Sequence, residues 1–305
     1  MTFKQFNRII EIRTKIISLG TFLSGTLYSV MVTRDIDLTR FFLMLVAVLC
    51  VDMGTTGFNS YFDFKSGTDT ASLNYERDKV LVHEGVSPHI ALIISLTLFM
   101  IAGLLGLILA YMTSFYLILV GGVCMVVGFI YTGGPYPISR TPFGEIFAGG
   151  FLGTVLFLIS FYVQSLNLTL EAFIVSIPLL LLIGMILTIN NTCDKVSDIQ
   201  AGRKTLSILL SEKANAAVIA IEFYGAYGFG ILLGFTPFLP IHISITLLIS
   251  LIFGHKEYRK MKHDGFSLKT KGISMGHVSK LFLLYVLGFV VGILSFLITS
   301  TYIPN

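Results

Sequence analysis

Nine long apolar segments constrain this chain more than any other feature of its sequence. They fall at residues 16–32, 40–58, 88–111, 114–131, 143–163, 171–189, 214–234, 238–254 and 280–302. A helix needs about 20 apolar residues to cross roughly 30 Å of hydrocarbon, where an isolated strand would leave its backbone polar groups unsatisfied. We therefore expect an all-α polytopic membrane protein with nine transmembrane helices.

The composition and the distribution of charge agree with this architecture. Hydrophobic residues make up 54% of the 305 residues and charged residues only 12%, against about 25% in soluble domains. If the N-terminus is cytoplasmic, that side receives nineteen Lys and Arg residues, and the other side only Arg34 and Arg40. This asymmetry follows the positive-inside rule. The net charge of +4 therefore reflects topology and gives no reason to expect nucleic acid as a partner.

No linker rich in proline or serine divides the sequence, so we expect a single membrane-embedded domain over residues 1–305. The three cysteines lack the spacing of metal ligands and would lie in spans or on the reducing side, which predicts no disulfide. The six histidines form no ligand pattern either.

Two polar motifs with the same spacing follow the second and the sixth apolar segments. "NSYFDFKSGTD" places Asn59 and Asp63 four residues apart, and "NNTCDKVSD" does the same for Asn190 and Asp194. Positions i and i+4 share a helix face, and Asp198 extends that face if the sixth helix continues to about residue 198. Four segments separate the motifs, so both would reach the cytoplasmic side in parallel, unlike the inverted repeats of many transporters.

The acidic residues of these motifs indicate a metal site. Asp63, Asp69, Asp194 and Asp198 carry four negative charges, which two Mg²⁺ ions would neutralise. Mg²⁺ prefers oxygen ligands and is often completed by substrate phosphates. Ordinary solvated acids at helix ends would explain any one of them, but carboxylates at a helix C-terminus oppose the helix dipole.

Cations follow each motif, with Arg203 and Lys204 after the second and Arg77 and Lys79 after the first. Such side chains can bind a diphosphate directly, although positive-inside topology accounts for any single one equally well. A magnesium diphosphate at the mouth of a membrane cavity implies a diphosphate with a hydrophobic tail. Asp52 and Glu222 lie inside apolar segments and are weaker functional candidates.

Three segments resemble the signature motifs of the UbiA superfamily of membrane prenyltransferases. They are "NSYFDFKSGTDT", "YTGGPYPISRTPFGEIFAGGFLGT" and "NNTCDKVSDIQAGRKTL". The branch that they resemble most is MenA, which transfers a polyprenyl chain to 1,4-dihydroxy-2-naphthoate in menaquinone synthesis. The resemblance implies a nine-helix bundle around a central cavity, with Mg²⁺ as cofactor and a polyprenyl diphosphate and an aromatic acceptor as substrates. It also implies a bacterial cytoplasmic membrane, with the active site near the cytoplasmic face. We infer no obligate protein partner.

The resemblance assigns a role to most of the candidate residues. It implies a metal site formed by Asp63, Asp69, Asp194 and Asp198, with a catalytic role for Asp63, Asp194 and Asp198. It implies substrate binding by Asn59, Asn190, Arg203, Tyr131 and Glu145, and Lys204, Arg77 and Lys79 are added for their charge, as argued above. Read without the resemblance, Glu145 is equally well explained as a first-turn acid that suits a helix dipole.

The sequence departs from the family pattern at two places. Ser60 stands where members often have aspartate, and Cys193 stands where they often have arginine. Three alternatives stay open: a different acceptor such as 4-hydroxybenzoate, a tetrapyrrole or another phenol; an ion-coupled transporter; and a catalytically silent paralog.

Overall fold

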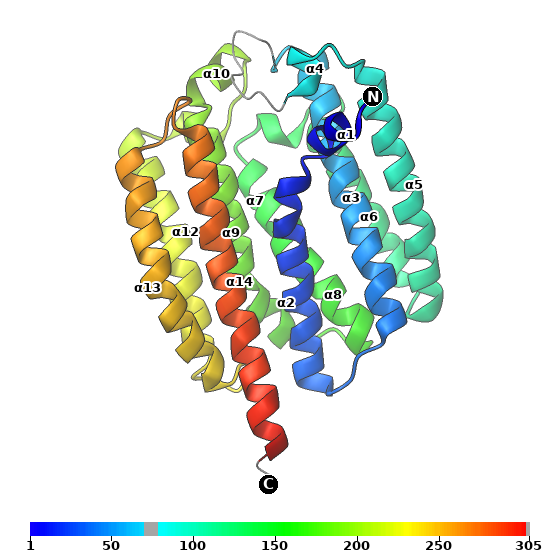
Figure 1. The fold of residues 1–305 in the computed structure, drawn as a ribbon, viewed down its shortest axis with the longest axis vertical. Coiled ribbons are helices and arrows are strands. Elements are labelled where there is room, and N and C mark those ends of the chain that lie inside the picture. Colours follow the sequence, from blue (N-terminus) through cyan, green and yellow to red (C-terminus); the bar gives the residue numbers. More distant parts are fainter. Residues whose placement is uncertain (70–78, 303–305) are drawn as a thin grey trace. The chain divides into compact units, whose positions relative to one another are not determined.

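The computed structural model describes residues 1–69 and 79–302, and within them every regular element is a helix. The order is α1 (Phe3–Ile9), η1 (Ile12–Lys15), α2 (Ile16–Thr33), α3 (Leu38–Lys65), α4 (Val80–His83), α5 (Pro88–Met112), α6 (Tyr116–Ile130), η2 (Ile138–Arg140), α7 (Gly144–Ala148), η3 (Gly149–Val155), α8 (Leu156–Ser165), α9 (Leu170–Cys193), α10 (Lys195–Gln200), α11 (Leu206–Leu209), α12 (Glu212–Leu233), α13 (Ile241–Asp264) and α14 (Lys271–Tyr302) (Figure 1). The predicted all-α class is confirmed.

Seven helical segments of the described residues are long and apolar enough to cross a membrane. They are Ile12–Thr33, Leu38–Lys65, Pro88–Met112, Gly144–Ser165, Leu170–Cys193, Glu212–Leu233 and Lys271–Ser300. The other two predicted spans coincide with α6 and α13. Helix α6 has 15 residues, or about 22 Å at 1.5 Å per residue, and α13 continues ten residues beyond the predicted end at residue 254 into a charged segment. The count of nine spans and the cytoplasmic N-terminus stay predictions.

The helices group into two compact units that alternate along the chain. The first unit comprises Met1–Leu19, Leu38–Gly144 and Lys195–Leu209. The second unit comprises Gly20–Asp37, Glu145–Asp194 and Leu210–Asn305. The expectation of a single domain stays a prediction.

In the first unit, α3 packs closely against α5 (Figure 1). Glycines on α3 allow this approach: a Cβ atom built on Gly57 would lie 2.2 Å from Oγ of Ser95, and one on Gly54 2.6 Å from the Phe99 ring. Asp52 of α3 is held by Lys15, whose Nζ lies 2.7 Å from Oδ1, and by the Ser18 hydroxyl at 2.6 Å. The intramembrane acid that seemed a functional candidate therefore has an ion pair that ties α3 to the N-terminal segment.

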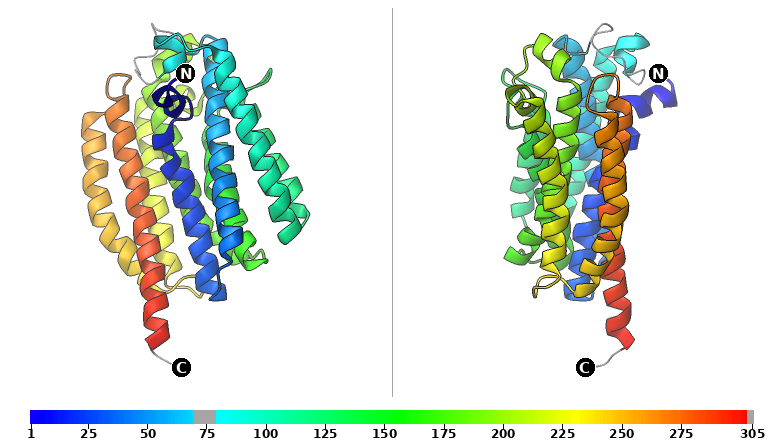
Figure 2. Two further views of the ribbon diagram at one scale, coloured as in Figure 1. Left: turned by 45° about the vertical axis from the view of Figure 1, so that its right-hand side comes forward. Right: turned by 90° about the vertical axis from the view of Figure 1, so that its left-hand side faces the viewer.

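In the second unit, α9 packs against η3 and α12, and α13 runs beside α14 (Figure 2). A Cβ atom on Gly149 would lie 2.4 Å from the Leu180 carbonyl oxygen, and one on Gly153 2.7 Å from the Leu180 backbone nitrogen. The backbones of η3 and α9 therefore touch, which holds Glu145 at the start of α7 close to the C-terminal half of α9.

Candidate functional site

The first motif lies at the C-terminal end of α3, as predicted. Asn59 and Asp63 stand one turn apart on the helix. The Thr132 hydroxyl, just after α6, donates to Oδ1 of Asn59 at 2.7 Å. Gly67 has a φ of 72°, in the left-handed region that glycine adopts without strain, and the chain turns there. Asp69 then donates its backbone N–H to the Asp63 carbonyl at 3.0 Å, so the two carboxylates of the first motif belong to one compact turn.

Arg203 joins the two motifs within the first unit. Its Nη2 lies 3.0 Å from Oδ1 of Asp63, and its Nη1 lies 3.2 Å from Oδ1 of Asp198. The arginine side chain is 10% exposed and that of Asp198 only 4%. Gly202, with a φ of 70°, turns the chain so that the Arg203 N–H donates to the Asp198 carbonyl at 2.9 Å. A planar guanidinium can hold two carboxylates at once.

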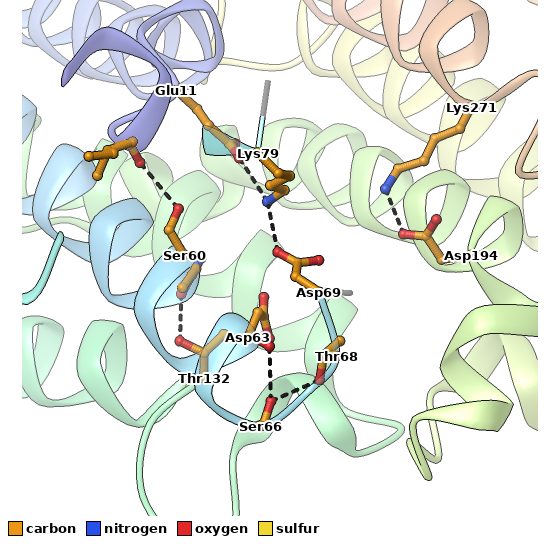
Figure 3. Close-up of polar contacts among 12 residues, drawn as sticks. Glu11, Ser60, Asp63, Ser66, Thr68, Asp69, Lys79, Thr132, Asp194 and Lys271 are labelled. Atoms are coloured by element: carbon orange, nitrogen blue, oxygen red, sulfur yellow. Dashed lines mark hydrogen bonds and ion pairs between the residues drawn. The ribbon is translucent and has the colours of Figure 1, made fainter. Parts of the chain in front are cut away.

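Two more cations complete the charge balance of this cluster. Lys79 Nζ lies 3.6 Å from Asp69 and 3.1 Å from Glu11 (Figure 3). The Arg140 guanidinium, from η2, donates to the Thr68 hydroxyl at 3.0 Å, beside Asp69 in the chain. Arg203, Lys79 and Arg140 thus surround the aspartates of the first unit, and Arg140 was missing from the predicted site.

Three other predicted substrate contacts lie around or outside this cluster. Lys204 has an exposed side chain, and its backbone N–H donates to the Arg140 carbonyl at 2.9 Å. Tyr131 is half-buried at the end of α6, where its carbonyl accepts from the Ser139 N–H at 2.8 Å. Arg77 lies outside the described residues.

The second motif does not form one continuous helical stripe, because the helix does not continue to residue 198 and the condition for placing Asp198 on that face is not met. Helix α9 ends at Cys193, Asp194 takes the cap position with φ −87° and ψ 2°, and α10 begins at Lys195. Asn190 is partly exposed in the last turn of α9, and its carbonyl accepts from the Asp194 N–H at 3.0 Å. Asp194 belongs to the second unit and Asp198 to the first.

A lysine that the sequence-based site lacked pairs with Asp194. Lys271, the first residue of α14, places its Nζ 2.7 Å from Oδ2 of Asp194, and both side chains are 14% exposed (Figure 3). The neighbouring Cys193 is buried. A cation from α14, far away in the sequence, thus pairs with the aspartate that follows Cys193. The other departure, Ser60, donates to the Ile9 carbonyl at 3.3 Å and ties α3 to the N-terminal segment.

A second cluster of polar side chains lies inside the second unit. Glu145 is 4% exposed, and its Oε1 accepts from the Asn191 amide at 2.9 Å. Glu222 of α12 accepts from the Thr188 hydroxyl at 2.9 Å. Gly184 stands between them, since its Cβ would lie 3.2 Å from Glu222 Oε1 and 3.8 Å from the Glu145 carbonyl. The second oxygen, Oε2, of each glutamate is buried without a hydrogen-bond partner in the described part of the chain.

The carboxylates present suit Mg²⁺ by donor type, because hard oxygen ligands are the ones that it prefers. Within residues 1–69 and 79–302, however, no three His, Cys, Asp or Glu side chains converge on one metal position. Asp63, Asp69, Asp194 and Asp198 each have a lysine or arginine partner instead. A metal at these residues would therefore need further ligands, such as phosphate oxygens or water.

Comparison with known proteins identifies the family to which this chain belongs. Residues 18–266 match the UbiA prenyltransferase family. A stretch of 205 residues is 39% identical to the 1,4-dihydroxy-2-naphthoate octaprenyltransferase of Bacillus subtilis, covering 67% of this chain and 65% of that protein. The chain thus spans slightly less than two thirds of the length of this relative.

Two solved structures share the fold. A digeranylgeranylglyceryl phosphate synthase aligns with a TM-score of 0.67 and 17% identity, covering 96% of this chain and 98% of that one. A UbiA homolog from Archaeoglobus fulgidus bound to DMAPP and Mg²⁺ aligns with a TM-score of 0.62 and 12% identity, covering 94% and 99%. With an all-helical fold, several apolar helices of membrane-spanning length and a family match over most of its residues, this chain is a multi-pass membrane protein that belongs to the UbiA prenyltransferase family.

Proposed function

We propose that this chain transfers a polyprenyl group from a prenyl diphosphate to 1,4-dihydroxy-2-naphthoate, with loss of the carboxylate, to give demethylmenaquinol, the reduced form of demethylmenaquinone. The relative from Bacillus subtilis supports the naphthoate acceptor. The observation that carries the proposal is Arg203, which brings Asp63 of the first motif and Asp198 of the second to one guanidinium. Acids and cations gathered in this way suit a magnesium diphosphate, which needs both.

In this proposal, Asp63, Asp69 and Asp198 of the first unit hold Mg²⁺, and Asp194 of the second unit has the same role. The homolog with DMAPP and Mg²⁺ supports the choice of metal. When bound, Mg²⁺ supplies charge neutralisation for the departing diphosphate. The carboxylates would have to release their present cations to bind it.

The cations then have a second use. Arg203 has five N–H donors in a planar fork, so it can transfer some of them from the carboxylates to phosphate oxygens. Lys79 and Lys204 can add point charges near the same turn. Such an exchange keeps the acids neutralised in both states, by lysine and arginine before substrate binds and by metal afterwards. The site then avoids several uncompensated charges at a membrane face.

The bond changes balance without an outside reactant. The C1–O bond of the prenyl diphosphate breaks, and its electron pair leaves with the diphosphate. The electron-rich ring carbon that bears the carboxylate attacks C1, and release of CO₂ returns its electron pair to the ring. Apolar helices around the reacting carbon would exclude water, which would otherwise quench the allylic cation.

We assign the acceptor contacts to the buried glutamates of the second unit. The unpartnered Oε2 atoms of Glu145 and Glu222 provide hydrogen-bonding positions that a hydroxylated ring can use, since a buried polar atom without a partner is costly. Asn191 and Thr188 hold the other oxygens and so orient the carboxyl groups. Tyr131 stays a candidate for the same role, and Asn59 and Asn190 for orienting the diphosphate.

Among the alternatives, a silent paralog loses support because Lys271 provides Asp194 with a cation despite Cys193. The family match favours a prenyltransferase over a transporter. Another phenolic acceptor stays open. We propose the bacterial cytoplasmic membrane as the location, with the active site near the cytoplasmic face.

The test uses purified protein in lipid with a polyprenyl diphosphate and Mg²⁺, and offers dihydroxynaphthoate or 4-hydroxybenzoate in parallel reactions. Mass spectrometry identifies the prenylated ring. We expect product from the naphthoate alone, no product from Asp194→Ala, and normal turnover by Asp35→Asn, which changes an exposed acid. Product only from 4-hydroxybenzoate would move the chain to another branch. Absence of product from either acid, with folded protein and several chain lengths tried, would refute the naphthoate assignment.

A further inference from the structure

An open cavity of about 600 Å³ lies between α12 and α13 in the second unit, and none of the residues that line it is assigned above to the reaction. Its lining is Tyr224, His255, Tyr258, Arg259, Lys262 and His263. Every one of these side chains is aromatic or basic. Such a lining suits an anion, because phosphate oxygens accept from arginine, lysine, histidine and tyrosine donors.

The cations of this cavity continue an apolar stripe on α13. Leu248, Ile252, His255, Arg259 and Lys262 follow one another at intervals of three or four residues, so they share one helix face. Leu248 and Ile252 are 47% and 58% exposed. The stripe is therefore apolar in the part of α13 that the sequence predicts to span the membrane and cationic at its end, which is the polarity of a phospholipid from acyl chain to headgroup.

The inner wall of the cavity is rigid. Tyr258 is buried, and its ring stacks on Phe223 with centroids 5.0 Å apart and an interplanar angle of 2°. The Tyr224 hydroxyl lies 2.8 Å from Nδ1 of His255 in a hydrogen bond, which leaves Nε2 of that ring for a ligand. A preformed wall lowers the entropy that a bound headgroup must lose.

The nearest acids are already neutralised by other groups. Glu257 is held by His277 at 2.8 Å and by Lys280 at 3.1 Å. Asp264 lies 3.1 Å from His277 and 3.6 Å from the lining residue His263. Within the described ranges, neither Arg259 nor Lys262 forms an ion pair, so their charges remain for a ligand.

We propose that this cavity binds the phosphate of an anionic membrane phospholipid, with an acyl chain lying along Leu248 and Ile252. Arg259 and Lys262 are the main phosphate contacts, and His255 and Tyr224 add hydrogen bonds. A free phosphate would use the same cations. The apolar stripe that leads into the cavity favours the lipid, because only an amphiphile fills both parts.

Native mass spectrometry of the purified full-length chain tests this site by titration with phosphatidylglycerol and with phosphatidylcholine. The double variant Arg259→Gln/Lys262→Gln should bind phosphatidylglycerol roughly 30-fold more weakly, because each cation near an anionic headgroup is worth about fivefold. The matched control Lys256→Gln/Lys260→Gln removes the same charge from another face of α13 and should bind as wild type. Phosphatidylcholine should bind all three proteins equally weakly.

Three results would overturn the proposal. Equal loss in both double variants would show a diffuse charge effect, and equal retention would show that the cavity is not the site. Displacement of the lipid by millimolar inorganic phosphate, with no added affinity from the acyl chain, would show an anion site without a lipid component. Melting curves check that each variant is folded. If the double variant melts at a lower temperature than wild type, the single variant Lys262→Gln replaces it and should lose about fivefold in affinity for phosphatidylglycerol.

Discussion

Replacing Arg203 with lysine keeps the positive charge but removes the fork that holds Asp63 and Asp198 together. In the structure, the guanidinium makes one charge-assisted hydrogen bond to each carboxylate, at 3.0 and 3.2 Å. A lysine ammonium at the end of a flexible stem can keep one of them. When Arg203 passes its donors to phosphate oxygens, lysine offers one fewer charge-assisted hydrogen bond, a loss of about 1.5–3 kcal/mol, which is roughly a 10- to 150-fold change in kcat/KM.

The readout is kcat/KM for the prenyl diphosphate, measured with saturating acceptor and Mg²⁺. We expect kcat/KM of Arg203→Lys to decrease by a factor within that range. The kcat/KM of Arg203→Gln, which loses both bonds and the charge, should decrease further. Arg13→Lys changes an exposed arginine of the same unit and should keep wild-type kinetics. Wild-type kcat/KM in Arg203→Lys would show that a single point charge suffices and that the fork of the guanidinium is not required.

Three further variants test other parts of the structure. Gly149→Ala places a methyl group 2.4 Å from a backbone oxygen of α9 and should cost about 1–3 kcal/mol of stability. The control Gly150→Ala places its methyl group where no atom lies within 4 Å and should melt like wild type. Equal melting temperatures of the two variants would contradict the close packing of η3 against α9. Lys271→Met removes the lysine that competes with Mg²⁺ for the Asp194 carboxylate, so half-maximal turnover should need a lower Mg²⁺ concentration. An unchanged Mg²⁺ dependence would show that Asp194 does not bind the metal. Glu145→Gln should raise KM for the acceptor and leave KM for the prenyl diphosphate unchanged; the reverse pattern would place this glutamate on the diphosphate side.

The helical architecture could be predicted because hydrocarbon leaves the backbone few options. Helix α3 extends through Asn59 and Asp63 as the four-residue spacing indicates, and the turn at Gly67 follows from its sequence. The exact ends of the apolar helices were harder to predict from the sequence. Helix α13 continues to Asp264 through residues too polar for a hydropathy window, since its terminal cations are solvated and suit the C-terminal dipole.

Partners far apart in sequence could not be predicted from local patterns. Lys271 lies 77 residues from Asp194, and Lys15 lies 37 residues from Asp52. Each lysine looked like an ordinary cation of a cytoplasmic loop. The break at Asp194 was missed for a different reason, since periodicity continues through a single non-helical residue and only the backbone angles reveal it.

In the proposed reaction, Asp63, Asp69, Asp194 and Asp198 act on a prenyl diphosphate through Mg²⁺. Diphosphate release, measured with dihydroxynaphthoate over a range of Mg²⁺ concentrations, tests this proposal most directly. We expect release that EDTA abolishes and added Mg²⁺ restores, and a loss of about 100-fold or more in Asp63→Asn and Asp198→Asn, with folding intact by melting curves. Metal-independent release, or wild-type release by both folded variants, would contradict it.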